Sequence, residues 1–337
     1  MIDTIISGDI QKILGKIDQT FFDGKKALVT GGAGFLGSYL CDTLVEANAY
    51  VDCLDNFSTG LKENIDHLFD NEKFRLIEED ACDFESNDGY DLLFHFASRA
   101  SPEEYPLHPI DTLLANSLGT YKMLKLARRQ GATFLFASSS EVYGDAQVVP
   151  TSESYWGNVN PVGIRSCYDE AKRVGEAFCM AFNRQHSVDA RIIRIHNTYG
   201  PRLRADGVYA RALSRFVMQA LQDKDFTIYG DGSQTRSFCY VTDTILGVLA
   251  AVTCQDCSGQ VFNIGNSKEI SILELTRKIK ELLNCRSKIK FLPLPEDDPK
   301  RRCPDISKAK EILRWEPTVK LADGLNKTIE WVRKSSL

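Results

Sequence analysis

The sequence has no long hydrophobic run and no excess of basic charge. Its longest apolar stretch, 245–252 (ILGVLAAV), is far short of the roughly 20 residues that a membrane-spanning helix needs. Lysine and arginine number 41 against 46 aspartates and glutamates, which gives a formal net charge of −5 and argues against a general binder of nucleic acid or anionic membranes. We therefore expect neither a membrane nor a nucleic acid as partner.

The N-terminus lacks the basic start, apolar block and small-residue cleavage site of a secretory signal, so we expect a cytoplasmic protein. The ten cysteines are scattered, and in such a compartment we expect free, mostly buried thiols. Cys254 and Cys257 form one C-x-x-C pair, but no second pair and no nearby histidine accompanies it. No zinc site, and no other metal site, is expected.

The length of 337 residues suggests about two domains at roughly 150 residues each. Residues 1–24 predict an amphipathic helix that packs on the main domain, because isoleucines recur at helical spacing. Residues 25–200 alternate strands with helices, which predicts an α/β fold with a Rossmann-type, doubly wound parallel sheet. The rhythm then becomes irregular, so 201–337 are expected to form mainly a smaller substrate-binding lobe, with some segments returning to the main domain.

The elements expected in the main domain are strands at 27–30, 50–55, 74–80, 92–97, 133–138 and 191–195, and helices that include 36–47 and 113–129. The elements expected in the smaller lobe are strands at 226–229 and 260–264 and helices at 272–283, 307–313 and 321–334.

A glycine-rich turn follows the first expected strand. Residues 31–37 (GGAGFLG) place Gly31, Gly34 and Gly37 in a G-x-x-G-x-x-G pattern that leads into a helix. Glycines let the backbone turn tightly and approach a pyrophosphate, whose charge meets the helix N-terminus. The next strand ends in Asp55, whose carboxylate can accept from both ribose hydroxyls and would repel a 2′-phosphate, so we expect NAD as cofactor. Asp80 and its neighbour, at the end of the third strand, are candidates to meet the adenine.

A tyrosine and a lysine, Tyr168 and Lys172, stand four residues apart and therefore share one helix face. A lysine ammonium there can favour the phenolate, although bringing a tyrosine pKa from about 10 to near 7 takes roughly 4 kcal/mol. A strand upstream ends in serines 138–140, and a hydroxyl there can bind the substrate oxygen that the tyrosine deprotonates. Alone, the Y-x-x-x-K spacing also fits a solvated pair; after a nucleotide fold it indicates a catalytic site.

From about residue 25 to its end, the chain resembles the extended short-chain dehydrogenase/reductases that act on nucleotide sugars. The motifs that carry the resemblance are the three glycines, Asp55-Asn56, 95–97 (HFA), 138–144 (SSSEVYG), Tyr168/Lys172, 197–202 (NTYGPR) and 229–243 (YGDGSQTRSFCYVTD). The resemblance implies that Tyr168 is the base, that Lys172 holds the ribose and tunes the tyrosine, and that Ser139 orients the sugar hydroxyl. The cofactor-binding residues expected are Gly31, Gly34, Phe35, Leu36, Asp55, Asn56, Asp80, Ala81, Ala97, Tyr168 and Lys172.

The resemblance also places a UDP-sugar on Asn197, Tyr229 and Arg236, with Arg236 as the best diphosphate candidate because a guanidinium suits phosphate. Arg202 and Arg194 are weaker candidates, and Arg194 fits a structural ion pair equally well.

Two positions beside Ser139 indicate which reaction the resemblance implies. Ser140 stands where the 4,6-dehydratases carry an acid, and Glu141 stands where simple 4-epimerases usually have a small or apolar residue. The UDP-glucuronate decarboxylases typically read S-E-V-Y-G, as this chain does, and they also resemble segments 155–173 and 297–305. In them an arginine at the position of Arg302 lies near the sugar carboxylate and works with the glutamate. Without the resemblance, 300–302 (KRR) is a solvated basic turn that balances acidic residues 296–298.

The implied activity is NAD-dependent decarboxylation of UDP-glucuronate to UDP-xylose, with a hydride taken from carbon 4 and later returned. The 4-keto intermediate is a β-keto acid, which loses carbon dioxide readily. A UDP-sugar 4-epimerase, acting on UDP-glucose, UDP-galactose or UDP-glucuronate, is the alternative. A non-catalytic NAD-binding sensor is disfavoured because Ser139, Tyr168 and Lys172 are all present. The resemblance further implies a homodimer in which the helix of Tyr168 pairs with the one near 113–129.

Overall fold

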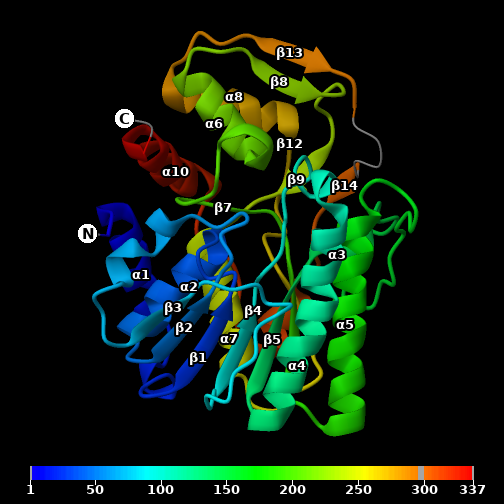
Figure 1. Cartoon of the computed structure of the whole chain (residues 1–337). Coiled ribbons are helices and arrows are strands. Elements are labelled where there is room, and N and C mark those ends of the chain that lie inside the picture. Colours follow the sequence, from blue (N-terminus) through cyan, green and yellow to red (C-terminus); the bar gives the residue numbers. More distant parts are fainter. Residues whose placement is uncertain (1, 295–299, 336–337) are drawn as a thin grey trace.

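The computed structural model describes residues 2–294 and 300–335 (Figure 1). Within these residues, seven parallel strands form the central sheet, in the order β11–β6–β5–β4–β1–β2–β3. The strands are β1 (Lys26–Thr30), β2 (Tyr50–Leu54), β3 (Phe74–Ile77), β4 (Leu92–His95), β5 (Thr133–Ser139), β6 (Ala190–Ile195) and β11 (Val261–Ile264). The expected Rossmann-type parallel sheet is thus confirmed, and its central strands are apolar because both faces are covered.

Helices cover both faces of this sheet (Figure 1). The elements on one face are α2 (Phe35–Glu46), α7 (Val241–Thr253) and, outside them, α1 (Thr4–Leu14). The elements on the other face are α3 (Pro109–Asn116), α4 (Leu118–Gln130) and α5 (Ser166–His186). The single helix expected at 113–129 is two helices, because the chain breaks at Ser117, whose φ is −106° and ψ −73° and whose hydroxyl bonds back to Leu113 O at 2.6 Å.

The strand expected at 260–264 belongs to the main sheet, so it is one of the segments after residue 200 that return to the main domain. Residues 261–264 form β11, which pairs in parallel with β6 and closes one edge of the main sheet. The physical reason is α7, which is buried along most of its length and packs against both β6 and β11. A parallel neighbour needs such a crossover helix, so the chain returns to the sheet before it leaves again.

The smaller lobe lies beyond the carboxyl ends of the sheet (Figure 1). Its helices and strands are α6 (Ala212–Leu221), β8 (Phe226–Tyr229), β9 (Thr235–Ser237), β12 (Glu269–Ser271), α8 (Ile272–Leu283), β13 (Ile289–Leu292) and β14 (Arg301–Arg302). The remaining regular elements are β7 (Thr198–Tyr199), β10 (Cys239–Tyr240), α9 (Ser307–Ile312) and α10 (Leu321–Ser335). Short 3₁₀ turns are η1 (Gln19–Phe21), η2 (Lys62–Asn64), η3 (Asp66–Leu68), η4 (Tyr105–Leu107), η5 (Ser140–Tyr143) and η6 (Gly207–Tyr209).

The N-terminal helix is anchored by both packing and charge. Ile6, Ile10 and Ile13 of α1 are buried against the main core, and α1 contacts α2 and α7. On the same helix, the buried Asp9 accepts a hydrogen bond from the Tyr240 hydroxyl at 2.6 Å and pairs with Lys327 of α10. The helix therefore joins the sheet domain to the C-terminal helix. No helix in the described part of the chain is long and apolar enough to cross a membrane.

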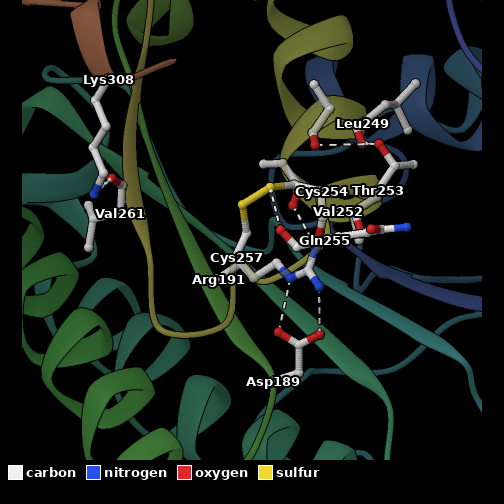
Figure 2. Close-up of a disulfide and its surroundings, with 12 residues drawn as sticks. Asp189, Arg191, Leu249, Val252, Thr253, Cys254, Gln255, Cys257, Val261 and Lys308 are labelled. Atoms are coloured by element: carbon white, nitrogen blue, oxygen red, sulfur yellow. Dashed lines mark hydrogen bonds and ion pairs between the residues drawn. A yellow bond between two sulfur atoms is a disulfide. The ribbon is translucent and has the colours of Figure 1, made fainter. Parts of the chain in front are cut away.

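The C-x-x-C pair is a disulfide, so the expectation of ten free thiols is wrong for Cys254 and Cys257 (Figure 2). The pair lies where α7 ends, and its Cα atoms are 5.7 Å apart, within the range that a disulfide spans. Arg191 supports this helix end: its Nη1 donates to the carbonyl of Val252 at 2.7 Å, and it also pairs with Asp189. The other eight cysteines, all within the described residues, are free.

Candidate active site

A cavity of about 760 Å³ lies where the carboxyl ends of the parallel strands meet the smaller lobe. This is the place where doubly wound sheets bind their ligands. All the residues expected from the sequence to form the site line this one cavity. They are Gly31, Gly34, Phe35, Leu36, Asp55, Asn56, Asp80, Ala81, Ala97, Ser139, Glu141, Tyr168, Lys172, Asn197, Tyr229, Arg236 and Arg302.

The glycine turn forms the floor of one end of the cavity. Gly31 has a φ of +69°, and a Cβ on it would lie 2.7 Å from the backbone nitrogen of Ala97, so glycine is required there. A Cβ on Gly37 would lie 2.1 Å from the carbonyl oxygen of Gly31. Gly34 caps α2 without a side-chain hydrogen bond, which leaves the first N–H groups of the helix available to an anion. A pyrophosphate fits this turn.

Asp55 is fixed at the wall beside the glycine turn. Its two carboxylate oxygens accept from the backbone N–H groups of Ala33 and Phe57, each at 2.9 Å. Burial raises the pKa of Asp55, while these two hydrogen bonds act in the opposite direction. Next to it, Asn56 donates to Asp80 Oδ2 at 2.7 Å. Held in this way, the carboxylate suits the ribose hydroxyls of NAD and opposes a 2′-phosphate, so this end of the cavity fits NAD.

Tyr168 and Lys172 lie on one face of α5 and are both buried. Lys172 Nζ donates to the carbonyl of Ala137 at 2.7 Å and lies 5.7 Å above the centre of the Tyr168 ring, and burial lowers its pKa to about 7. Burial raises the pKa of Tyr168 to about 12; a hydrogen bond with Ser139 and the charge of Arg211 oppose that rise. A phenol, a hydroxyl and an ammonium thus surround one point of the cavity, as removal of a proton from a substrate hydroxyl requires.

Glu141 forms ion pairs with two guanidinium groups. Arg302 Nη1 lies 2.6 Å from Glu141 Oε1, and both Arg302 Nη2 (2.8 Å) and Arg165 Nη2 (2.6 Å) donate to Glu141 Oε2. Burial opposes ionisation of Glu141, but the charges of Arg302 and Arg165 outweigh it and lower its pKa to about 2. The carboxylate is therefore ionised at any working pH.

Arg302 is not part of a solvated basic turn. Its side chain is only 11% exposed and contacts Glu141, whereas the neighbouring Arg301 is exposed and pairs with Glu269. The alignment of β14 with β9 places Arg302 directly beside Arg236. The acidic residues 296–298, and with them 297–299 of the segment that resembles the decarboxylases, lie outside the described residues.

The substrate half of the cavity carries the expected polar groups. Asn197 Nδ2 donates to Ser237 O at 3.2 Å, which orients this amide, and Arg236 Nη1 donates to Thr235 O at 2.9 Å. The guanidinium of Arg215 lies 4.8 Å above the ring of Tyr229. An aromatic ring with guanidinium groups beside it suits the nucleobase and the diphosphate of a nucleotide.

Two of the weaker diphosphate candidates are held in ion pairs. Arg194 forms a two-point ion pair with Glu176, with distances of 2.9 and 2.7 Å, which fits the structural alternative. Arg202 is buried and donates to Asp42 Oδ2 at 2.7 Å, although it also borders the cavity.

Arg165 and Tyr105 are residues of the site for which the sequence indicated no role. Arg165, the second partner of Glu141, stands three residues before Tyr168, so helical spacing offered a signal for it. Tyr105 stacks on the Tyr168 ring with centroids 5.0 Å apart and planes 6° from parallel. It comes from η4, a distant loop, and no local pattern pointed to it.

Comparison with protein families gives one clear result. The model of the family described as "NAD dependent epimerase/dehydratase family" matches residues 27–265. The chain is 48% identical to UDP-glucuronic acid decarboxylase 1 of Xenopus tropicalis over 93% of its own length and 73% of that protein. It is 46% identical to UDP-glucuronic acid decarboxylase 3 of Arabidopsis thaliana over 89% of its length and 86% of that protein.

Solved structures with the same fold bind related ligands. UDP-glucuronic acid 4-epimerase of Bacillus cereus, in complex with UDP-glucuronic acid and NAD, matches with a TM-score of 0.84 and 31% identity over 92% of this chain and 99% of that one. UDP-glucose 4-epimerase of Thermotoga maritima, with UDP-glucose, matches with a TM-score of 0.85 and 31% identity over 93% of this chain and 100% of that one.

Proposed function

The chain belongs to the NAD dependent epimerase/dehydratase family, and we propose that it decarboxylates UDP-glucuronate to UDP-xylose. The observation that carries this function is the buried Glu141 held by Arg302 and Arg165 beside Tyr168. Relatives that are 46–48% identical over most of the chain are named UDP-glucuronic acid decarboxylases.

The first step uses the residues at the end of β5 and on α5. When bound at the glycine turn, NAD supplies the hydride acceptor for carbon 4 and, at the end of the cycle, the hydride donor. Tyr168 takes the proton of the 4-hydroxyl, and Ser139 holds that oxygen. In its protonated form, the buried Lys172, anchored on Ala137 O, places a positive charge beside the phenol and so favours the phenolate.

Decarboxylation then follows from the position of the new ketone. Carbon 4 is β to the carboxylate on carbon 5, so the electrons of the breaking carbon–carbon bond flow into an enolate. Tyr168, Lys172 and Ser139 stabilise that oxyanion. Arg302 and Glu141 line the same cavity, where they orient the departing carboxylate and control the proton that carbon 5 receives.

Product analysis tests this function against the alternative, a UDP-sugar 4-epimerase such as the structural matches. Incubation with UDP-glucuronate and catalytic NAD is expected to give a product lighter by one carbon dioxide, with no net reduction of the cofactor. A product of unchanged mass and new retention time, measured by liquid chromatography and mass spectrometry, would establish epimerisation instead. That outcome would remove the assigned role of Glu141.

We also propose a homodimer built on α3, α4 and α5 (Figure 1). An uncovered apolar face supports it, and its members are the exposed Leu107, Ile110, Leu113, Leu114, Leu118, Tyr121 and Val174. Side chains of this kind gather on interfaces rather than on free surfaces. A cytoplasmic location is part of the same proposal.

A single substitution that places a charge on this face tests the dimer. Sedimentation of the wild-type chain at micromolar concentration is expected to give a dimer, and Leu114→Glu, which places a carboxylate on this face, is expected to give a monomer. Ile312→Glu is the matched control, because Ile312 is equally exposed but lies on α9. A monomeric wild-type chain would contradict the proposal.

A further inference from the structure

Asp169 is a buried carboxyl group that the reaction scheme above does not use. It follows Tyr168 on α5 and is 6% exposed. Its Oδ2 lies 3.9 Å from Arg165 Nε, and its Oδ1 has no hydrogen-bond partner among the described residues. Burying an ionised carboxylate with so few partners costs much free energy, whereas burying the neutral carboxylic acid costs far less. Its protonation state therefore responds to the charges around it.

The charges around Asp169 are those of the decarboxylation site itself. Glu141 raises its pKa by repulsion, Arg165 and Arg302 lower it, and Glu170 of the same helix raises it slightly. Tyr105 also faces it from η4. The buried positions of α3 and α4, which pack on α5, carry no charged side chains.

The cluster of Arg165, Arg302, Glu141 and Asp169 can be described by its net charge. Arg165 and Arg302, which contact Glu141 directly, contribute two positive charges and Glu141 one negative charge, so these groups and Asp169 are together neutral only when Asp169 is ionised. Arg236, which adjoins Arg302 and also acts on Glu141, is counted with the diphosphate that it is expected to bind. A glucuronate brings one more negative charge to Arg302. The cluster with the substrate is then neutral only when Asp169 carries a proton. Burial favours neutral arrangements strongly, because unpaired charge is poorly solvated there.

Resting on the proposed function, we infer that Asp169 compensates the charge of the substrate: it takes up one proton from solvent when the substrate carboxylate binds and returns one proton to solvent after carbon dioxide has left. The chemistry balances. The bond between carbon 5 and the carboxylate breaks, its electron pair enters the enolate, and carbon 5 then gains one proton from solvent. The sum is R–CO₂⁻ + H⁺ → R–H + CO₂.

The resting state of Asp169 suits this role. Burial and the neighbouring Glu141 raise its pKa to about 7 against the pull of Arg165. At neutral pH the carboxyl group is thus divided between its two forms, and an added negative charge shifts it toward the protonated form. Because Asp169 acts through Arg165 and Glu141 and does not line the cavity, it is a positioning residue.

Proton uptake on binding tests this inference directly. UDP-4-deoxy-4-fluoro-glucuronate carries the carboxylate but no 4-hydroxyl, so the NAD-loaded enzyme can bind it without oxidising it. Titration calorimetry in buffers of different ionisation enthalpy counts the protons taken up. We expect about half a proton at pH 7 and close to one at pH 8, because the resting pKa is about 7. UDP-xylose, which has no carboxylate, should cause no uptake.

Two variants assign the proton to its residue. Asp169→Asn is expected to bind the fluoro-sugar and lose the uptake, while Glu170→Gln, which removes the adjacent carboxyl group, should keep it. Uptake that persists in Asp169→Asn would place the proton elsewhere, for example on Lys172, and overturn the inference. Equal uptake with both sugars would also overturn it, and this comparison needs no variant. Failure of the wild-type enzyme to bind the fluoro-sugar would instead count against the proposed function.

Discussion

Replacing Glu141 with glutamine is expected to lower the rate of carbon dioxide release by about 10²- to 10⁴-fold, the range for loss of a group that controls a proton. The amide keeps the size of the side chain but not its charge, so Arg302 and Arg165 lose their common anion. These guanidinium groups are then free to hold the substrate carboxylate more tightly. The expected signature is a fall in kcat with an unchanged or lower KM. Mass spectrometry of the product measures it.

The control for this variant is Glu316→Gln, because Glu316 is an exposed glutamate that pairs with Lys310 far from the cavity. It should release carbon dioxide at the wild-type rate. NAD binding by Glu141→Gln, followed by fluorescence quenching, should also be unchanged, since the glycine turn and Asp55 lie elsewhere in the cavity. Full decarboxylation by Glu141→Gln would exclude the role given to this residue.

The pKa of Glu141 also sets the limits of its influence on pH dependence. Its folded pKa of about 2 lies below the ordinary glutamate value, so its ionised form stabilises the fold above pH 4.5 and this contribution is lost as the pH falls toward 2. Between pH 5 and 8 Glu141 does not titrate. Glu141 therefore does not account for a change of rate in that range, whereas Asp169 and Lys172, each with a pKa of about 7, titrate there.

The sheet could be predicted from the sequence because its evidence is local. Most of the six strands expected before residue 200 are short apolar runs that alternate with helical patterns. A parallel sheet follows from that alternation. The edge position of β11 could not be predicted, because it depends on where α7 packs. The break at Ser117 was equally hidden, since residues 113–129 have one continuous helical pattern.

In the candidate site too, short local motifs could be predicted from the sequence, whereas contacts between distant segments could not. The glycine turn, Asp55 and the Tyr168/Lys172 spacing are visible in the sequence because each motif is a few residues long. The contact between Glu141 and Arg302 spans 161 positions, and only the resemblance to the decarboxylases suggested it before the structure placed the two side chains together. Nothing local predicts the stacking of Tyr105 on Tyr168 or the unpartnered oxygen of Asp169, since both result from packing between distant segments.

Replacing Tyr168 with phenylalanine is the second change with a large expected effect. Loss of the general base should lower kcat by about 10²- to 10⁴-fold. The ring that stacks on Tyr105, with centroids 5.0 Å apart, remains, so the buried packing and the fold should persist. The rate of the wild-type enzyme should rise with pH until the phenol of the complex is ionised, because burial holds its pKa above the ordinary value. This dependence should disappear in the variant.

The two variants stop the reaction at different steps, and this separates their roles. In a single turnover with UDP-glucuronate, Tyr168→Phe should form almost no reduced cofactor, because proton removal and oxidation at carbon 4 occur together. Glu141→Gln retains Tyr168, Ser139 and Lys172, so it should still reduce the cofactor while releasing little carbon dioxide. Stopped-flow absorbance of the reduced cofactor distinguishes these results. A burst in Tyr168→Phe equal to that of the wild type would mean that another group is the base, and the short contact between the Lys172 ammonium and Ala137 O would then be structural.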